Sequence, residues 1–340
     1  MPTIRLTLAY DGTDFAGWQH QKNGLSVQEA LETALCKIIG RPVACRAAGR
    51  TDAGVHAMGQ VVSFRLGCVP PDAGVPAAAA APAAPPSSRP AAAPPPTGGH
   101  PTGGHPTGEP PTGEPPTSEP PTSEPLTSEP PTSESPTSEP PTGEPPTGEP
   151  PAGERVVTLR SIIRGTNYHL PPAIRILDAQ LAADEFDARF SASGKLYRYQ
   201  LWNALTESPL HARTHWHLIA PLDLAAMQQA AARLVGHHDF RAFRSASCER
   251  LTTHRTMHRL AVVRQSDCPA AVHIEVEATA FLRNMVRILA GTLVDVGRGR
   301  LTPAAVAALL HSGDRTRAGP TAPAHGLILW RVDYGPRSGL

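Results

Sequence analysis

A short loop around Asp52 holds the residues of this 340-residue chain that are best suited to chemistry. Positions 49–54 read GRTDAG, so one carboxylate stands two residues after an arginine and between two glycines. An aspartate carboxylate is ionised at neutral pH and can act as a nucleophile without a general base. The glycines suit tight turns and let a partner approach the backbone closely. The plainer alternative is an ordinary aspartate turn between two strands.

A second group of candidate residues comes from a run that is typical of extended structure. In a strand, Lys195, Tyr197 and Tyr199 project from the same face, and the odd-numbered positions from Arg189 to Ser193 join them if the strand is unbroken. A cationic and aromatic face of this kind can hold a phosphate and stack an unpaired base. The alternative is a solvated sheet edge with tyrosines packed on a neighbouring strand.

The histidines have spacings that resemble metal ligands, but the pattern is incomplete. His211, His215 and His217 follow H-x-x-x-H-x-H, and His254 and His258 are four residues apart. A zinc site of the H-E-x-x-H kind needs a carboxylate between its histidines, and none is present here. We therefore expect no metal site.

Cysteines and glycines also exclude some classes of site. The five cysteines are scattered, odd in number and form no C-x-x-C pair, which argues against a disulfide framework or a zinc ribbon. The Gly297-Arg298-Gly299 turn lacks a preceding strand and a third glycine, which disfavours a dinucleotide site. The sequence therefore predicts no metal and no organic cofactor.

The elements around Asp52 are predicted from periodicity and caps. Residues 4–10 alternate as a strand, and a helix with a capping-box pattern begins after Ser26 and ends at Gly40. Strand-like runs at 42–48 and 59–65 flank the aspartate loop. This order of strand, helix, strand, loop and strand is that of an α+β half-domain of the ferredoxin-like (RRM-like) type.

The second half of the chain repeats the pattern. We expect extended structure around a turn at 186–202, a helix at 222–235, strands at 255–265 and 272–281, helices at 284–296 and from 302, and a last strand at 327–334. Two such half-domains facing each other would form a pseudo-symmetric sheet with a central cleft.

Low-complexity sequence separates the halves. Residues 69–153 hold 28 of the 39 prolines and follow a five-residue period from Pro94, so they predict a disordered insert. The expected domain organisation is a first part of the N-terminal half-domain at 1–68, the insert at 69–153, a return to that half-domain at 154–180 and a C-terminal half-domain at 181–340.

The net charge of +1 hides a basic protein. The insert contains ten acidic residues and one arginine, so the remainder carries about +10. Arginine supplies 28 of the 31 basic residues, and its guanidinium group binds phosphate in a bidentate manner and stacks on bases. This composition supports a nucleic-acid partner, although arginine-rich usage can also follow from a GC-rich genome.

The N-terminus alternates like a strand and lacks the apolar core of a signal peptide. No apolar stretch is long enough to span a bilayer. We expect a cytoplasmic protein without a membrane partner.

Four stretches together resemble the TruA-type tRNA pseudouridine synthases. They are the run at 47–64 around Asp52, YDGTDFAGWQ at 10–19, ARFSASGKLYRY at 188–199 and FLRNMVR at 281–287. They stand in the order of that family, and the resemblance runs from residue 4 to residue 334 apart from the insert.

The resemblance implies a function and roles for particular residues. Such an enzyme isomerises uridine to pseudouridine at tRNA positions 38–40, in the anticodon stem-loop, as a homodimer without a cofactor. By resemblance Asp52 is the nucleophile, Tyr197 stacks on the uracil, Arg287 pairs with Asp52, and Arg50 helps to extrude the nucleotide, while Lys195 joins the substrate-binding face. The alternative is a catalytically inert protein that binds or folds tRNA.

Overall fold

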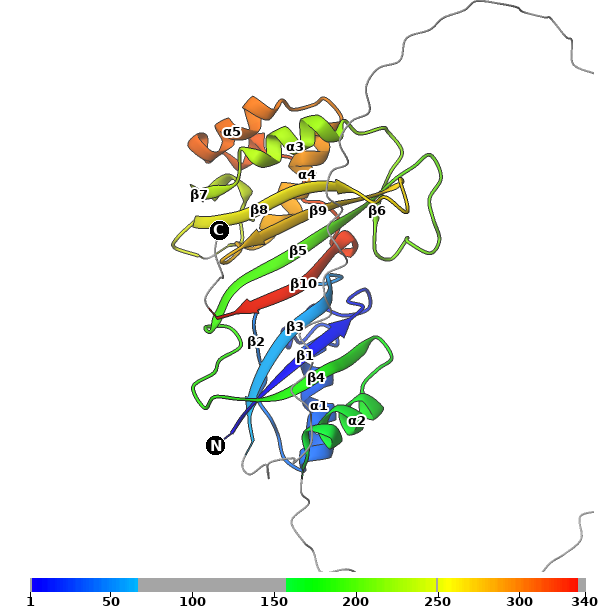
Figure 1. The fold of residues 1–340 in the computed structure, drawn as a ribbon, viewed down its shortest axis with the longest axis vertical. Helices are drawn as coiled ribbons and strands as arrows, with labels where there is room; N and C mark the ends of the chain where they lie inside the picture. The colour runs from blue at the N-terminus through cyan, green and yellow to red at the C-terminus, as the bar shows by residue number, and fades with distance from the viewer. Residues whose placement is uncertain (1, 67–156, 249, 336–340) are drawn as a thin grey trace, which may run out of the picture. The chain divides into compact units, whose positions relative to one another are not determined.

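The computed structural model describes residues 2–66, 157–248 and 250–335 (Figure 1). All of them belong to one compact unit formed by residues 1–74 and 154–340. The insert predicted at 69–153 lies outside the described residues, and the domain limits stay a prediction.

A single ten-stranded sheet runs through the described residues, in the order β4-β1-β3-β10-β5-β9-β8-β7, with β2 beside β3 and β6 beside β5. The strands are β1 Thr3–Tyr10, β2 Arg46–Ala47, β3 His56–Arg65, β4 Ile174–Ala182, β5 Ala192–Asn203, β6 Trp216–Leu218, β7 Gly236–Asp239, β8 His254–Arg264, β9 Ala271–Ala278 and β10 Leu327–Tyr334. The sheet is mixed, because β10 is parallel to β3 and β6 is parallel to β5 while the other pairs are antiparallel.

Five α-helices accompany this sheet in the described residues: α1 Val27–Ile39, α2 Leu159–His169, α3 Leu224–Ala232, α4 Met285–Gly297 and α5 Pro303–Ser312. In the view of Figure 1, α1 and α4 lie behind the strands. The predicted α+β class is confirmed, whereas the description as two ferredoxin-like halves around a cleft stays a prediction.

Helix α1 shows how local sequence fixes an element. The Ser26 hydroxyl accepts a hydrogen bond from the Glu29 backbone N–H at 3.2 Å, and Gly40 ends the helix in the left-handed conformation at φ 79°. The apolar stripe of the helix is buried, including Leu31 and Leu35 with no exposed area. The predicted helix between Ser26 and Gly40 is confirmed.

The last strand, β10, stands in the middle of the sheet. Its Leu329 lies opposite Ala57 of β3 on one side and opposite Tyr197 of β5 on the other. Leu329 has no exposed area, so β10 is packed as a central strand. It thereby joins the strand that follows the Asp52 loop to the strand that carries the candidate tyrosines.

The strand predicted at 42–48 is mostly wrong. Only Arg46 and Ala47 pair with β3, through Ser63 and Val62. The preceding Cys45 donates its backbone N–H to the Glu32 carboxylate of α1 at 2.8 Å, so that group does not join a ladder.

The extended run predicted at 186–202 also starts later than expected. Residues 187–191 form a turn in which the Asp187 carboxylate accepts the Arg189 N–H at 2.8 Å and the Asp187 carbonyl accepts the Ser191 N–H at 2.9 Å. Arg189 and Ser191 therefore do not lie in phase with Tyr197 on strand β5, which begins at Ala192.

Three histidines of the C-terminal half, His211, His215 and His273, form a ring cluster with Trp202, in which His215 and His273 are buried. Trp202 stacks on His211 with ring centroids 4.4 Å apart, and His215 contacts both His211 and His273. Among the described residues, no group of three or more histidine, cysteine or acidic side chains is placed to hold a metal ion. Within that same part of the chain, no helix has the length and apolar character needed to cross a membrane.

This cluster predicts an acid-sensitive fold. Burial, with a smaller contribution from neighbouring positive charges, lowers the pKa of His215 and of His273 from 6.5 to about 4. The unfolded chain therefore binds more protons than the folded chain between pH 6.5 and pH 4, and each histidine removes up to about 1.4 kcal/mol of stability per pH unit as the pH falls through this window. We expect urea unfolding to show this loss.

Replacement of His273 in this cluster should reduce the pH dependence of the unfolding free energy. In His273→Gln the slope of unfolding free energy against pH between 6.5 and 4 should be shallower, whereas the exposed control His169→Gln should keep the wild-type slope. An unchanged slope in His273→Gln would contradict the assignment of acid sensitivity to this cluster.

Candidate active site

The Asp52 loop lies against strand β5. A β-carbon added to Gly49 would lie 3.3 Å from Cε of Lys195 and 3.6 Å from the hydroxyl oxygen of Tyr197. The backbone of the loop therefore approaches these two side chains closely, which is possible because position 49 has no side chain. The structure thus brings together the loop with Arg50 and Asp52 and the strand with Lys195 and Tyr197.

The N-terminal motif at 10–19 supports the loop from behind. The Trp18 backbone N–H donates to the Thr51 carbonyl at 3.0 Å. Gly17 has φ 99°, and a β-carbon there would lie 2.8 Å from that same carbonyl oxygen and 3.1 Å from the carbonyl carbon of Asp52. A β-carbon at Gly12 would overlap the carbonyl oxygen of Val55. Backbone contact at both ends of the loop explains these two glycines.

In the N-terminal motif, which also contains Asp14, Asp11 forms a turn. Its carboxylate accepts the Thr13 N–H at 3.0 Å and the Thr13 hydroxyl at 2.6 Å. Arg213 lies between the two carboxylates, 3.4 Å from Asp11 and 2.7 Å from Asp14. The turn therefore also anchors the segment between β5 and β6.

A buried hydrogen-bond network fixes the other side of the loop. The Tyr10 hydroxyl and the Thr51 hydroxyl are 2.8 Å apart, and Gln60 donates its amide to the Gly49 carbonyl at 2.8 Å and to Tyr10 at 3.4 Å. Burial raises the pKa of Tyr10 to about 12, so it stays a neutral phenol. These bonds hold both ends of the segment 49–51 that leads to Asp52.

We expect Tyr10→Phe to loosen the loop. The change removes a buried hydroxyl and leaves Thr51 without this partner, which costs about 1–2 kcal/mol of stability. Because the loop moves, kcat should fall several-fold. The matched control is Tyr334→Phe, which removes a hydroxyl bonded to the Ala188 carbonyl at 2.7 Å. The control should lose stability, measured by urea unfolding, but keep kcat, and an equal fall in kcat would contradict a role for the network.

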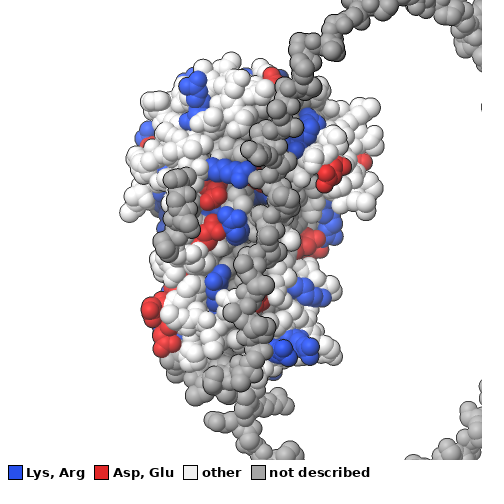
Figure 2. Space-filling view, viewed as in Figure 1, with Lys and Arg blue, Asp and Glu red and all other residues white. Residues whose placement is uncertain are grey.

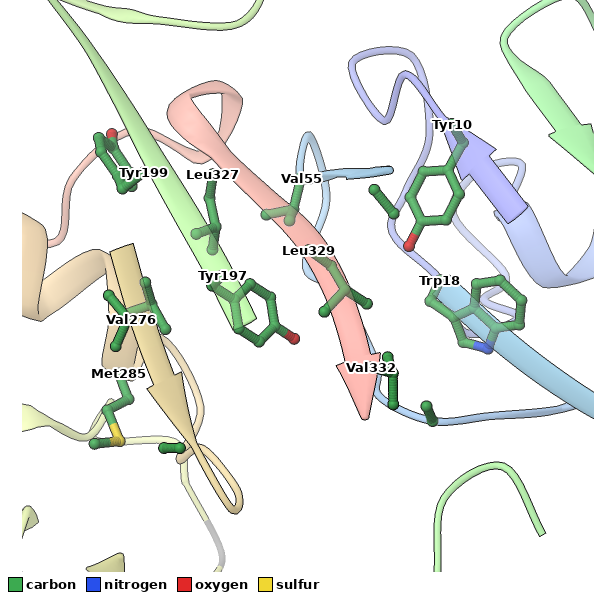
Figure 3. Close-up of a cluster of buried hydrophobic side chains, with 14 of the residues drawn as sticks. Tyr10, Trp18, Val55, Tyr197, Tyr199, Val276, Met285, Leu327, Leu329 and Val332 are labelled. Carbon is green, nitrogen blue, oxygen red and sulfur yellow. The ribbon is translucent and has the colours of Figure 1, made fainter. Parts of the chain in front are cut away.

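Tyr197 is buried and faces the loop. Burial raises its pKa above the ordinary value for tyrosine, and the neighbouring Tyr10 and Asp52 raise it further. Its ring meets the edge of the Phe281 ring at a centroid distance of 5.0 Å. In Figure 3 the hydroxyl oxygens of Tyr10 and Tyr197 point toward the region between the two rings, near Leu329. Tyr197 is thus a neutral aromatic group within range of the Asp52 charge.

Arg287 approaches the site from helix α4. Its Nε donates to the Ala322 carbonyl at 2.7 Å, and one terminal nitrogen donates to the Asn284 side-chain oxygen at 3.3 Å. Asn284 precedes the helix with φ 59°, a left-handed conformation that asparagine tolerates. Among the described residues Arg287 and Asp52 form no ion pair, and the contacts of the guanidinium group are these two oxygens.

The segment 322–326 links Arg287 to the aspartate loop. The hydroxyl of Tyr199 donates to the Pro323 carbonyl at 2.7 Å, and a β-carbon at Gly54 would lie 3.3 Å from the Ala324 β-carbon. Burial raises the pKa of Tyr199, whereas the charge of Arg287 opposes this effect, which places the two side chains near each other. Asp52 and Arg287 are therefore connected through one short segment.

The two remaining predicted residues differ in exposure. Arg50 is exposed beside the loop, where it can reach a ligand. Lys195 is half-buried, and burial together with the charge of Arg189 lowers its pKa. A cation in this setting gains more from an anionic ligand than a fully solvated lysine does.

Sequence reasoning missed His56, which follows the loop directly. His56 is 4 % exposed, and its Nδ1 accepts the Gly12 N–H at 3.0 Å while its Nε2 lies 3.0 Å from the carbonyl oxygens of both Arg213 and His325. A proton on Nε2 would donate to these two carbonyls, and Nδ1 also lies 3.1 Å from the Asp11 carboxylate. His56 therefore joins three segments that are far apart in the sequence.

Charged side chains are mixed on the face that Figure 2 presents, where red and blue atoms lie close together and no large area of one colour is seen outside the grey atoms. Ion pairs on central strands agree with this, since Glu275 of β9 lies 2.8 Å from both Arg198 and Arg259. Such pairs offset part of the positive charge and leave one arginine of this group of three uncompensated.

Comparisons with known proteins show which family this chain belongs to. A family model described as tRNA pseudouridine synthase matches residues 7–97 and 230–335. The tRNA pseudouridine synthase A of Myxococcus xanthus is 38% identical over 334 residues, which cover 98% of this chain and 92% of that protein. The corresponding enzyme of Syntrophotalea carbinolica is 37% identical over 99% of this chain and 98% of its own length.

This chain belongs to the TruA family of tRNA pseudouridine synthases. The predicted family is therefore confirmed, and so is the prediction of an enzyme, an isomerase that acts in tRNA modification. Family membership favours the synthase over the inert tRNA-binding protein considered above. The tRNA pseudouridine synthase motifs at 10–19 and 47–64 are the segments that meet around Asp52 in the structure.

Proposed function

We propose that this enzyme isomerises uridine to pseudouridine in the anticodon stem-loop of tRNA, with Asp52 as its nucleophile. The main support is the closeness of the Asp52 loop to Tyr197. Burial is the largest cause of the raised pKa of Tyr197, the neighbouring Tyr10 is the second, and the charge of Asp52 is the third. A carboxylate beside a neutral aromatic ring suits a reaction at the sugar of a base that is held by stacking.

The reaction sets the tasks of the site. The N1–C1′ glycosidic bond is cleaved, the uracil turns while it stays bound, and a C5–C1′ bond forms as the C5 proton leaves and N1 takes up a proton. The target nucleotide must first leave its stack. Asp52 starts the cleavage by attack on C1′ or by removal of a sugar proton, and Tyr197 stacks on the uracil.

Three basic residues complete the proposed site. Arg50 is exposed and contacts the RNA backbone as the nucleotide is extruded. Lys195, beneath Gly49, binds a phosphate or a uracil oxygen. Arg287 stands on helix α4, where the Ala322 carbonyl and the Asn284 side chain hold its guanidinium group in place.

The finer assignment to tRNA positions 38–40 and to a homodimer follows from the resemblance of the motifs. Light scattering coupled to size-exclusion chromatography tests the homodimer, which should have twice the 35.9 kDa mass of the chain.

The proposed function is tested by tritium release from tRNA labelled at C5 of uridine. Wild-type enzyme should release tritium from a tRNA with uridines at 38–40 and none from a tRNA in which these are replaced by cytidine. Carbodiimide treatment and primer extension should place pseudouridine at those positions. Tight tRNA binding without release would contradict the proposal, and release from other positions would contradict the assigned site.

A further inference from the structure

Four arginines gather beside the start of helix α4 on a part of the surface to which the predicted site assigns no role. Arg244 and Arg250 belong to the segment between β7 and β8, Arg255 lies on β8, and Arg283 precedes α4. We call these four residues the arginine cluster. Arg250 and Arg283 are exposed, and the other two are half-buried.

The contacts of Cys248 show that the cluster is compact. Burial would raise the pKa of its thiol, but hydrogen bonds from the backbone N–H groups of Arg250 and Arg283 and the charges of Arg244 and Arg250 outweigh burial and lower that pKa. In addition, a terminal nitrogen of Arg244 donates to the Arg250 carbonyl at 3.5 Å. Three of the four arginines therefore surround one sulfur atom.

The positive charges in the cluster repel one another. Burial lowers the pKa of Arg255, and the charge of Arg250 lowers it further. The Nε atom of Arg255 is buried and has no hydrogen-bond partner among the described residues. The nearby carboxylate of Asp239 lies 3.9 Å from the Nε atom of Arg241, outside the cluster. Glu249 lies outside the described residues, and counting it leaves the cluster at +3.

The cluster adjoins the candidate active site. Phe281, whose ring touches Tyr197, is two residues before Arg283, and Arg287 is one helical turn after it. The Ser245 N–H donates to the Arg283 carbonyl at 3.1 Å, which fastens the 244–248 segment to this position. If an RNA base lies on Tyr197, the phosphates next to that base are therefore within reach of these guanidinium groups.

From this arrangement we propose that the arginine cluster binds the phosphates of the RNA strand next to the extruded uridine. Guanidinium groups bind phosphate in a bidentate manner, and uncompensated positive charges that are held together favour a polyanion over a single anion. The surface thus fixes the strand on the α4 side of the site. The inference rests on the proposed function, because it assumes an RNA base on Tyr197.

The test uses a double variant in which both exposed arginines are replaced, Arg250→Gln and Arg283→Gln. Its control is Arg160→Gln on the exposed face of α2. Each phosphate contact contributes about 0.7 to 0.9 to the slope of log affinity against log salt. For tRNA binding by the double variant, the magnitude of this slope should therefore be smaller by about 1 to 2 than for the wild type. The KM of the double variant should rise about tenfold, with a much smaller change in kcat. The control should match wild type in slope and KM.

Cys248 supplies a second readout in the unmodified enzyme. Its lowered pKa favours alkylation by iodoacetamide, since the thiolate is the reacting form. Saturating tRNA should slow alkylation of Cys248 several-fold, measured by peptide mass spectrometry, and leave Cys268 between β8 and β9 unaffected.

The outcomes separate this inference from the proposed function. Suppose that the wild-type enzyme turns over, that the double variant keeps the wild-type salt slope and KM, and that tRNA does not protect Cys248. This result would contradict phosphate binding by the arginine cluster and leave the proposed synthase function intact. Absence of tritium release from the wild type would overturn the proposed function itself. A reduced slope together with protection of Cys248 supports the inference.

Discussion

Asp52→Asn should reduce tritium release from C5-labelled tRNA by at least about 10³-fold, the scale of loss that follows removal of a nucleophile. The amide is neutral and a poor nucleophile, yet it has nearly the volume of the carboxylate. Since Asp52 makes no side-chain hydrogen bond or ion pair with another described residue, the change removes no contact of the folded chain. Both tRNA affinity and thermal stability should stay near wild type.

The matched control for this prediction is Asp178→Asn on the edge strand β4, where the carboxylate accepts the Gln180 amide at 2.8 Å. It should release tritium at the wild-type rate. Filter binding and thermal unfolding accompany both variants. If Asp52→Asn turned over as fast as Asp178→Asn, another residue would have to be the nucleophile.

Gly12→Ala should have the second largest effect. A β-carbon at position 12 would overlap the carbonyl of Val55, which is backbone and cannot rotate away. The loop end must move, and a misplacement of about 1 Å at reacting groups can cost about 10²-fold in rate. We expect kcat to fall by about 10²-fold and unfolding free energy by about 2 kcal/mol, as in other changes that overpack a site.

A second glycine in the same N-terminal segment serves as the control. At Gly24 the nearest atom to an added β-carbon is the β-carbon of Ala16 at 3.3 Å, so Gly24→Ala needs only a small adjustment. It should keep kcat within about twofold of wild type. Stopped-assay kinetics and urea unfolding measure both variants. A kcat for Gly12→Ala equal to that of Gly24→Ala would show that this contact does not position the loop.

Elements with local signals could be predicted from the sequence. Helix α1 has both a capping serine and a left-handed glycine, and its limits agree with the prediction. Helix α2 was not predicted, although its Thr158 and Ser161 form a reciprocal cap, because Ser161 is not the Glu or Gln that the usual pattern requires. The strand at 42–48 was overpredicted because pairing partners, which sequence does not show, decide where a strand ends.

The structure brings together residues that the sequence singled out, but their connections could not be predicted from the sequence. Tyr197 and Asp52 were both singled out, and the structure places their loop and strand together. The position of Arg287 depends on Ala322, and His56 bonds to His325, which is 269 residues away. Such contacts form only when β10 pairs with both β3 and β5, and no periodicity in the sequence records them.

The central position of β10 has a consequence for synthesis of the enzyme. Until residues 327–334 have left the ribosome, β3 lacks one neighbour and β5 lacks another, so the loop with Asp52 has no fixed relation to Tyr197. Activity therefore appears only after β10 has been translated, however long the earlier strands have been folded. A nascent chain can bind no tRNA productively before that moment, and the two open strand edges make the unfinished chain prone to association.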